Sequence, residues 1–271
     1  MQIYQIEIEN QKPNAPMVSI TLLQALLSVI IEGSKGALRL RTEGRSMVRG
    51  APPQWIKAAT TFSMEIQENQ LHLRSPTLYE AAPEVFEQSD WFPDLNSGQT
   101  SLDYFQETLS VILTQTGFIH DNKSHEIVDS LYDKPLLEAL CGFRHVFNHG
   151  ASKIRFPQEN GIQIVPETIT AFKGLAKDIP LPCPVKVAGK LDVLRIQDRL
   201  FKLITANNER VIKGIVKPIT PREAKAVLGQ NVLIPGMAYF TNSGELLRIE
   251  AEQISIATEN ELALWGELPA P

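Results

Sequence analysis

Short alternating segments fill the last third of the chain, and this pattern limits the possible folds more than any other feature. In residues 185–193 every second residue is apolar or glycine, which indicates a strand with one buried face. Two more segments of this kind, RLFKLIT and ERVIKGIV, flank a turn at Asn207 and Asn208. A helical segment, TPREAKAVLG, follows, and then come NVLIPGMAYF and ELLRIEAEQISI. The sequence therefore predicts three strands, a short helix and two further strands.

This order of elements, over residues 183–257, resembles the OB-fold. The resemblance implies a small barrel, all of whose regular structure is strand apart from one helix. Gly189 and Gly236 lie where barrel strands must bend sharply. In the last segment the apolar positions slip between Ala251 and Ile254, which predicts a β-bulge there.

The first part of the chain mixes both kinds of pattern. Residues 2–9 alternate and predict a strand, and residues 62–73 predict a hairpin. Residues 78–132 have a helical pattern, and a last helix is expected from Asp133 to Phe147. We therefore expect an α+β N-terminal domain in which helices pack on a small antiparallel sheet.

Between the first strand and the hairpin, the sequence predicts a helix and then a strand. Thr21 and Gln24 can form a capping box at the start of the helix, and Gly33 or Gly36 is expected to end it. The next five residues, ALRLR, alternate. They predict a strand with both leucines buried and both arginines exposed.

Five prolines within residues 157–184 mark a change of composition between the two parts. We place an α+β domain at residues 1–178, an OB-like β-barrel domain at 179–258 and a tail at 259–271. Trp265 in this tail either docks on the protein or contacts a partner.

The chain of 271 residues is long enough for two domains, and its net charge of −5 disfavours nucleic acid or an anionic membrane as an overall partner. Its two cysteines, Cys141 and Cys183, form no disulfide framework or metal motif. The start of the chain lacks the pattern of a signal peptide, and the longest apolar run, residues 20–31, is too short to span a membrane. We expect a soluble cytoplasmic protein with no membrane partner.

The barrel differs in charge from the rest of the chain. Residues 181–258 hold 11 Lys and Arg against 7 Asp and Glu, a net charge of +4. OB-folds that bind single strands use a basic groove and stacked aromatic side chains. The sequence favours a barrel that serves a protein contact or packs on its neighbour domain, because aromatic residues are scarce in its strands. The alternative is an interface for RNA or single-stranded DNA, and its candidates are Lys186, Lys190, Arg195, Arg199, Phe201, Lys202, Arg210 and Lys213.

A second candidate for anion binding is the segment RLRTEGRSMVRG. Four arginines, Arg39, Arg41, Arg45 and Arg49, lie close to glycines and a serine in it. Arginines beside free backbone amides can hold a phosphate or a carboxylate. The segment lacks the Gly-Lys-Ser/Thr of a P-loop, and outward arginines on a strand are more often solvated.

The segment FRHVFNHG carries the only candidate catalytic pair. Arg144 and His149 form an R-x4-H pattern that resembles the motif of HEPN ribonucleases. The resemblance implies metal-independent RNA cleavage, with histidine moving a proton and arginine holding a phosphate. That family is a bundle of long helices, whereas this region follows several expected strands. The alternative is the exposed end of a helix that stops at Gly150.

Four histidines, His120, His125, His145 and His149, lie within thirty residues, and the last two share a helical face. No further ligand follows at a telling distance, so we expect solvated histidines and no metal. No flavin, nicotinamide or ATP motif is present, so we expect no cofactor.

These patterns favour a non-enzymatic binding or adaptor protein that acts through protein–protein contacts. The first alternative is single-stranded nucleic-acid binding through the basic barrel. The second is an endoribonuclease that uses Arg144 and His149.

Overall fold

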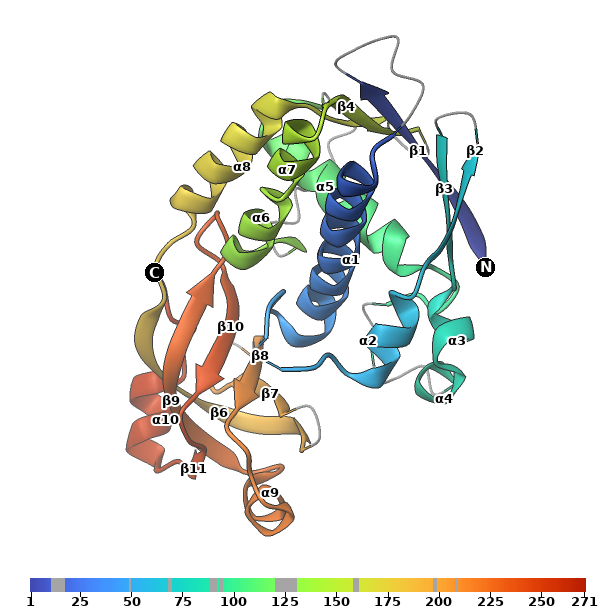
Figure 1. The fold of residues 1–271 in the computed structure, drawn as a ribbon. Helices are drawn as coiled ribbons and strands as arrows, with labels where there is room; N and C mark the ends of the chain where they lie inside the picture. The colour runs from blue at the N-terminus through green and yellow to red at the C-terminus, as the bar shows by residue number, and fades with distance from the viewer. Residues whose placement is uncertain are drawn as a thin grey trace. The chain divides into compact units, whose positions relative to one another are not determined.

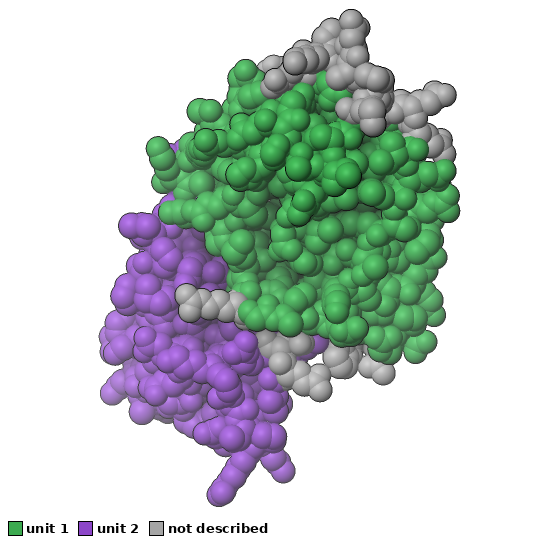
Figure 2. All heavy atoms as spheres, viewed as in Figure 1, with its two compact units in different colours: residues 1–177 green, residues 178–271 purple. Residues whose placement is uncertain are grey.

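The computed structural model describes two compact units, residues 1–177 and residues 178–271 (Figure 2). Within them it describes residues 1–10, 18–48, 50–67, 70–87, 92, 95–119, 131–157, 161–196, 199–207 and 209–271.

Unit 1 contains an antiparallel sheet in the order β2-β3-β1-β4-β5 (Figure 1). Its strands are β1 (Gln2–Asn10), β2 (Ser63–Gln67), β3 (Gln70–Ser75), β4 (Ala151–Phe156) and β5 (Ile162–Ile164). The helices of the same unit are α1 (Ile20–Glu43), α2 (Gln54–Ala59), α3 (Leu78–Ala81), α4 (Pro83–Phe86), α5 (Ser101–Gln115), α6 (Lys134–Leu140), α7 (Phe143–Asn148) and α8 (Pro166–Asp178). The predicted α+β class is thus confirmed, and the first strand and the hairpin are β1 and β2–β3.

The central helix α1 differs from its prediction in both its start and its end. Its N-cap is Ser19, whose side chain accepts a hydrogen bond from the Leu22 amide at 3.2 Å. The helix continues through ALRLR and ends at Gly44, whose φ of 68° suits a glycine C-cap. Residues 37–41 are therefore helical, and the prediction of a strand there is wrong.

The two glycines expected to end this helix instead allow other helices to approach it. A Cβ atom added at Gly33 would lie 2.3 Å from Cε2 of Phe105 on α5, and one at Gly36 would lie 2.7 Å from Cδ1 of Leu136 on α6. By length and composition α1 could cross a membrane. It packs against α5, α6 and α7.

The predicted helix from Asp133 to Phe147 is divided in two. Asp133 caps α6, and a turn at Cys141 and Gly142 separates α6 from α7. At Gly142 a Cβ atom would lie 2.8 Å from Cγ2 of Val29, so this turn lies directly against α1.

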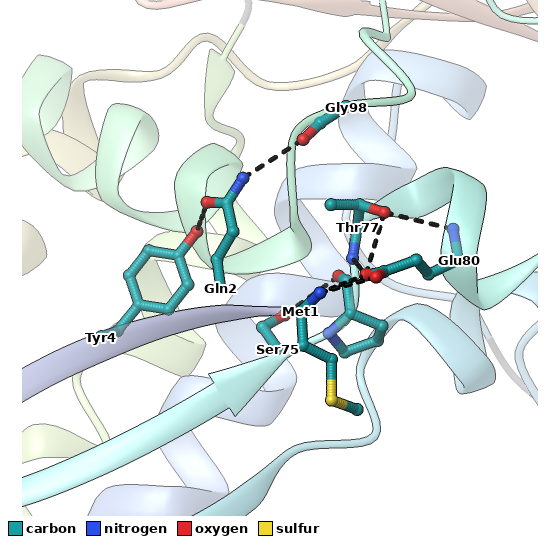
Figure 3. Close-up of polar contacts among 8 residues, drawn as sticks. Met1, Gln2, Tyr4, Ser75, Thr77, Glu80 and Gly98 are labelled. Carbon is teal, nitrogen blue, oxygen red and sulfur yellow. Dashed lines mark hydrogen bonds and ion pairs between the residues drawn. The ribbon is translucent and has the colours of Figure 1, made fainter.

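The short helix α3 is capped by Thr77, and its carboxylate Glu80 completes the capping box (Figure 3). Both oxygens of Glu80 also accept hydrogen bonds from the N-terminal ammonium of Met1, at 2.6 and 2.7 Å. These contacts, with the hydrogen bond from the Thr77 amide, lower the pKa of Glu80 to about 2. The start of β1 is thereby joined to the segment that follows β3.

Unit 2 is a closed five-stranded mixed barrel with one additional short strand (Figure 1). Around the barrel the order is β6-β7-β8-β10-β9, and β9 pairs with β6 to close it. The β8–β10 pair is parallel and the other pairs are antiparallel. The elements are β6 (Cys183–Arg195), β7 (Leu200–Thr205), β8 (Val211–Val216), α9 (Pro221–Val227), β9 (Asn231–Phe240), β10 (Leu246–Ala251), β11 (Ser255–Ile256) and α10 (Glu259–Trp265). A barrel consistent with the OB-like expectation is thus confirmed.

Two glycines allow neighbouring strands of the barrel to come close. An added Cβ would lie 2.1 Å from the Ile204 oxygen at Gly189, and 2.3 Å from the Glu250 oxygen at Gly236. No side chain fits at these distances, so both positions require glycine because of the close approach of a neighbouring strand. After Ala251 strand β10 ends, and β11 then pairs with β9. The four-residue step from Ala251 to Ser255 lies opposite the three-residue step from Gly236 to Leu233 on β9, so one extra residue is present, as expected of a bulge.

The C-terminal segment packs on the barrel. Helix α10 contacts β6 and β9, and the Gly266 oxygen accepts a hydrogen bond from the Asn207 amide at 3.1 Å. Beyond α10, Leu268 packs against the apolar core of the barrel. Trp265 therefore lies on the barrel, with its ring 5.7 Å from the Lys186 ammonium.

Candidate nucleic-acid interface

The outer surface of β6, β7 and β8 gathers three lysines on three adjacent strands. Along β7 the side chains of Phe201, Leu203 and Thr205 are buried, so Lys202 and Ile204 point outward. The strand register sets Lys190 beside Ile204, and Ile204 beside Val211. It also sets Val193 beside Lys202, and Lys202 beside Lys213. We call these six residues, Lys190, Val193, Lys202, Ile204, Val211 and Lys213, the lysine face.

Two lysines of this face are direct cross-strand partners. Lys202 on β7 is paired with Lys213 on β8 in the antiparallel register. Directly opposed residues have Cα atoms roughly 4.5–5.5 Å apart, and like charges at such positions destabilise a sheet. An anion between the two ammonium groups would interact with both of them. The exposed carboxylate of Asp192, in the bulge of β6 between Leu191 and Val193, lies on the same outer surface.

The loops at the two ends of β7 contain backbone strain. Among the described residues, Arg199 (φ 59°) and Glu209 (φ 51°) are the non-glycine residues with positive φ. Arg199 comes directly before β7, and Glu209 belongs to the turn between β7 and β8. Such conformations cost about 1–3 kcal/mol each and occur often at binding sites.

The remaining barrel candidates have different positions. Arg199 and the exposed Arg210 lie in the loops that border the lysine face, and Arg195 is the last residue of β6. Lys186 lies on the side covered by α10, where it lines a cavity of about 570 Å³ with Trp265. Phe201 is 1% exposed in the barrel core, so its ring cannot stack on a base, contrary to the expectation.

The N-terminal arginines are mostly engaged within unit 1. Arg41 is 8% exposed; it donates hydrogen bonds to the Ala37 oxygen at 3.0 Å and pairs with Glu107 at 2.7 Å. Arg45 pairs with Glu43 at 3.1 Å. Arg39 is 5% exposed, and burial lowers its pKa. Arg39 and Arg41 do not point outward from a strand, contrary to the expectation, because they belong to the last part of helix α1. Arg45 follows the C-cap of this helix. Arg49 lies outside the described residues.

The candidate catalytic pair is not assembled in the groove nearest to it. A groove of about 520 Å³ lies between α1 and α7, and its lining includes His145 and His149 but not Arg144. On a helix, residues five apart differ by about 140° in direction, whereas residues four apart differ by about 40°. The side chains of Arg144, His145 and His149 are all exposed, and the groove brings His145 and His149 together.

The predicted histidine cluster is described only in part, because His120 and His125 lie outside the described residues. Within the described ranges no group of three or more His, Cys, Asp or Glu is placed to hold a metal ion.

The apolar part of the lysine face was not found from the sequence. In RLFKLIT both alternating sets contain apolar residues, so the pattern does not say which set faces outward. The structure places Ile204 outward and leaves Val211 59% exposed.

Comparisons with protein-family models, with curated proteins and with solved structures give no match for this chain.

Proposed function

We propose that the protein binds single-stranded RNA or DNA on the lysine face of its barrel. The observation that carries the proposal is the pairing of Lys202 with Lys213 on adjacent strands. Two neighbouring ammonium groups can interact with the same phosphate. Lys190, on the third strand, extends the same positive surface.

The architecture supports the same function. A closed barrel in which the middle strands face solvent is the arrangement by which OB-folds bind extended strands, with the adjoining loops at the edges of the site. Here the strained residues Arg199 and Glu209 lie in those loops. Strand binding to such a surface needs no metal or cofactor, and the free thiols Cys141 and Cys183 suit the reducing cytoplasm that we propose as its location.

The test is the salt dependence of binding to a labelled oligo-dT, measured by fluorescence anisotropy. Three lysines that each contact a phosphate give a slope of log K against log salt of about −2.1, since each contributes about 0.7 for single strands. Raising the salt fourfold should then weaken binding about 18-fold. In the double variant Lys202→Gln/Lys213→Gln the slope should fall to about −0.7.

The matched control is Lys225→Gln, which removes the same charge from the exposed surface of α9 in the same unit. It should leave both affinity and slope near those of the wild type. Absence of oligonucleotide binding at low salt would refute the proposal and favour the protein-binding adaptor predicted from the sequence.

The nuclease prediction is tested in the same samples. Labelled RNA is incubated with the wild type and with His149→Ala, and its length is followed on a gel. Because the groove contains His149 without Arg144, we expect intact RNA in both samples. Cleavage by the wild type alone would establish His149 as a catalytic residue.

A further inference from the structure

Strand β2 (Ser63–Gln67) forms one edge of the sheet in unit 1 (Figure 1). It pairs with β3 on one side, and among the described residues no strand pairs with its other side. Natural proteins protect such edges with a lysine, a proline, a β-bulge or an inward-pointing charge. This strand contains no lysine or proline, keeps a regular register with β3, and is exposed over residues 63–66. The edge is therefore available to a further strand.

The inner face of the sheet is apolar up to this edge. The register sets Met64 beside Leu73, and Ile66 beside Leu71. Both leucines are buried, whereas Met64 and Ile66 are 50% and 52% exposed. Glu65 lies between them in sequence and so belongs to the outer face, and no charge interrupts the apolar row. The apolar surface of the core thus continues to the edge, where it is only half covered.

We propose that β2 pairs antiparallel with β2 of a second copy of this chain, about a two-fold axis at Met64. In this register Met64 lies opposite Met64 of the second copy, and Ser63 lies opposite its Glu65. The sequence FSMEI alternates symmetrically about its central methionine. One residue further along, Phe62 lies opposite Ile66 of the second copy. Each apolar side chain then meets another apolar side chain on the same face.

The charges of the outer face favour this register. Pairing about Glu65 would set two Glu65 carboxylates directly opposite each other, which destabilises a sheet. Pairing about Met64 instead sets each Glu65 opposite the small side chain of Ser63. The row continues from Ser63 to Arg74 on β3, and on the other side from Glu65 to His72. Each row across the dimer therefore contains one carboxylate and one guanidinium.

This charge complementarity identifies a second copy as the partner. Within one chain, Arg74 already lies 3.4 Å from Glu65, and both side chains are half-exposed. At 4.7–4.9 Å between strands, the backbones of Arg74 and of Glu65 in the second copy are roughly 10 Å apart, which the two long side chains can span over Ser63. The two glutamates are diagonal neighbours in the dimer, and the two arginines neutralise them. A foreign strand would need both this apolar pattern and this carboxylate, which β2 itself carries.

The experiment measures the oligomeric state of the full chain by sedimentation velocity over a dilution series. We expect a dimer for the wild type. Met64→Lys and Met64→Glu each set like charges opposite each other and remove the apolar contact, so each should raise the dissociation constant by about tenfold or more. An equimolar mixture of these two variants should restore the dimer. Met47→Lys is the matched control, because it adds the same charge at a methionine that is 59% exposed elsewhere in unit 1, and it should dimerise as the wild type does.

Cysteine variants test the register without adding a charge. Directly opposed Cα atoms lie about 4.5–5.5 Å apart, which a disulfide can bridge, so Met64→Cys should form a covalent dimer on oxidation. Glu65→Cys should not, because Ser63 lies opposite it. The wild type, with its free Cys141 and Cys183, is the control for this reaction.

Three results would overturn the proposal. The first is a wild type that is monomeric throughout the dilution series, and the second is a dimer that Met64→Lys leaves intact. The third is a covalent dimer formed by Glu65→Cys in place of Met64→Cys. Because no probe of the barrel enters these measurements, they test the edge strand independently of nucleic-acid binding.

Discussion

Replacing Gly33 with alanine should destabilise the protein, although alanine is the better helix former. The added Cβ would lie 2.3 and 2.7 Å from Cε2 and Cδ2 of Phe105, more than 0.5 Å inside ordinary contact. Phe105 is 1% exposed, and its ring packs edge-on against Phe156 at 6.1 Å, so it cannot move aside freely. The whole of α5 or the phenyl ring must shift to accept the methyl group.

The magnitude follows from two opposing effects. Overpacking of a tight core destabilises the folded state by about 1–3 kcal/mol, and the higher helix propensity of alanine stabilises it by about 1 kcal/mol. Because the clash is with a confined ring, we expect Gly33→Ala to lower the free energy of unfolding by about 1–2 kcal/mol. For a unit of this size, each kcal/mol lowers Tm by about 2–4 °C.

Gly174→Ala is the matched control. Gly174 also lies inside a helix of unit 1, but nothing lies within 4 Å of the Cβ position. This variant should therefore gain about 0.5–1 kcal/mol of stability. Both variants are compared with the wild type by differential scanning calorimetry and urea titration. A Gly33→Ala protein as stable as the wild type would refute the close approach of α1 and α5.

Two further predictions concern unit 1. The pKa of Glu80 in the folded protein, about 2, lies below the ordinary value of 4.5. The ionised carboxylate therefore stabilises the fold above pH 4.5, and this stabilisation is lost as the pH falls toward 2. In Glu80→Gln, the stability measured by urea titration should depend less on pH in this range. Thr100 is fully buried, caps α5 and forms a hydrogen bond with the Tyr4 hydroxyl at 2.6 Å. Thr100→Ala should therefore lower the free energy of unfolding, measured by urea denaturation, by about 1–2 kcal/mol. Thr100→Ser keeps the hydroxyl and should retain most of the wild-type stability.

The barrel could be predicted from the sequence because its strands alternate and its turns are polar. Each strand of a small barrel has one buried face, so period-two apolar positions appear directly in the chain. The sequence singled out Gly189 and Gly236 as positions where barrel strands bend, and the structure shows that a neighbouring strand comes close at both. Local patterns were sufficient there because the interactions that decide the fold are between neighbouring strands.

Helix α1 could not be predicted in full because distant residues decide it. A glycine near the end of an apolar helical pattern is typical of a C-cap, and only Phe105 and Leu136, both distant in sequence, make it a packing position. The segment ALRLR fits a strand pattern equally well. In the structure all five of its residues are buried, so no amphipathic period distinguishes helix from strand.

The candidate site was predicted in charge but not in geometry. The sequence shows that the barrel is basic, yet it does not say which lysines share a surface. Phe201 was a candidate for base stacking because it is one of the few aromatic residues in the barrel strands, and the sequence does not say which of them fill the core. Its true direction follows from register: Phe201 is paired with Gly214, and an added Cβ there would lie 2.1 Å from the Phe201 ring.

If the lysine face is shaped for a ligand, it should reduce the stability of the unliganded barrel. Lys202→Thr removes one member of the opposed pair and places a β-branched residue on β7, so it should stabilise the protein by about 0.2–1 kcal/mol. The same change should lower the salt slope of oligo-dT binding by about 0.7.

Lys190→Thr provides the comparison, because Lys190 is paired with Ile204 and Asn231 and faces no like charge across the sheet. It should reduce the salt slope equally without the gain in stability from relieved repulsion. Equal changes in stability for the two variants would show that the repulsion between Lys202 and Lys213 is negligible. The electrostatic argument for a ligand between them would then fail, even if the barrel binds nucleic acid elsewhere.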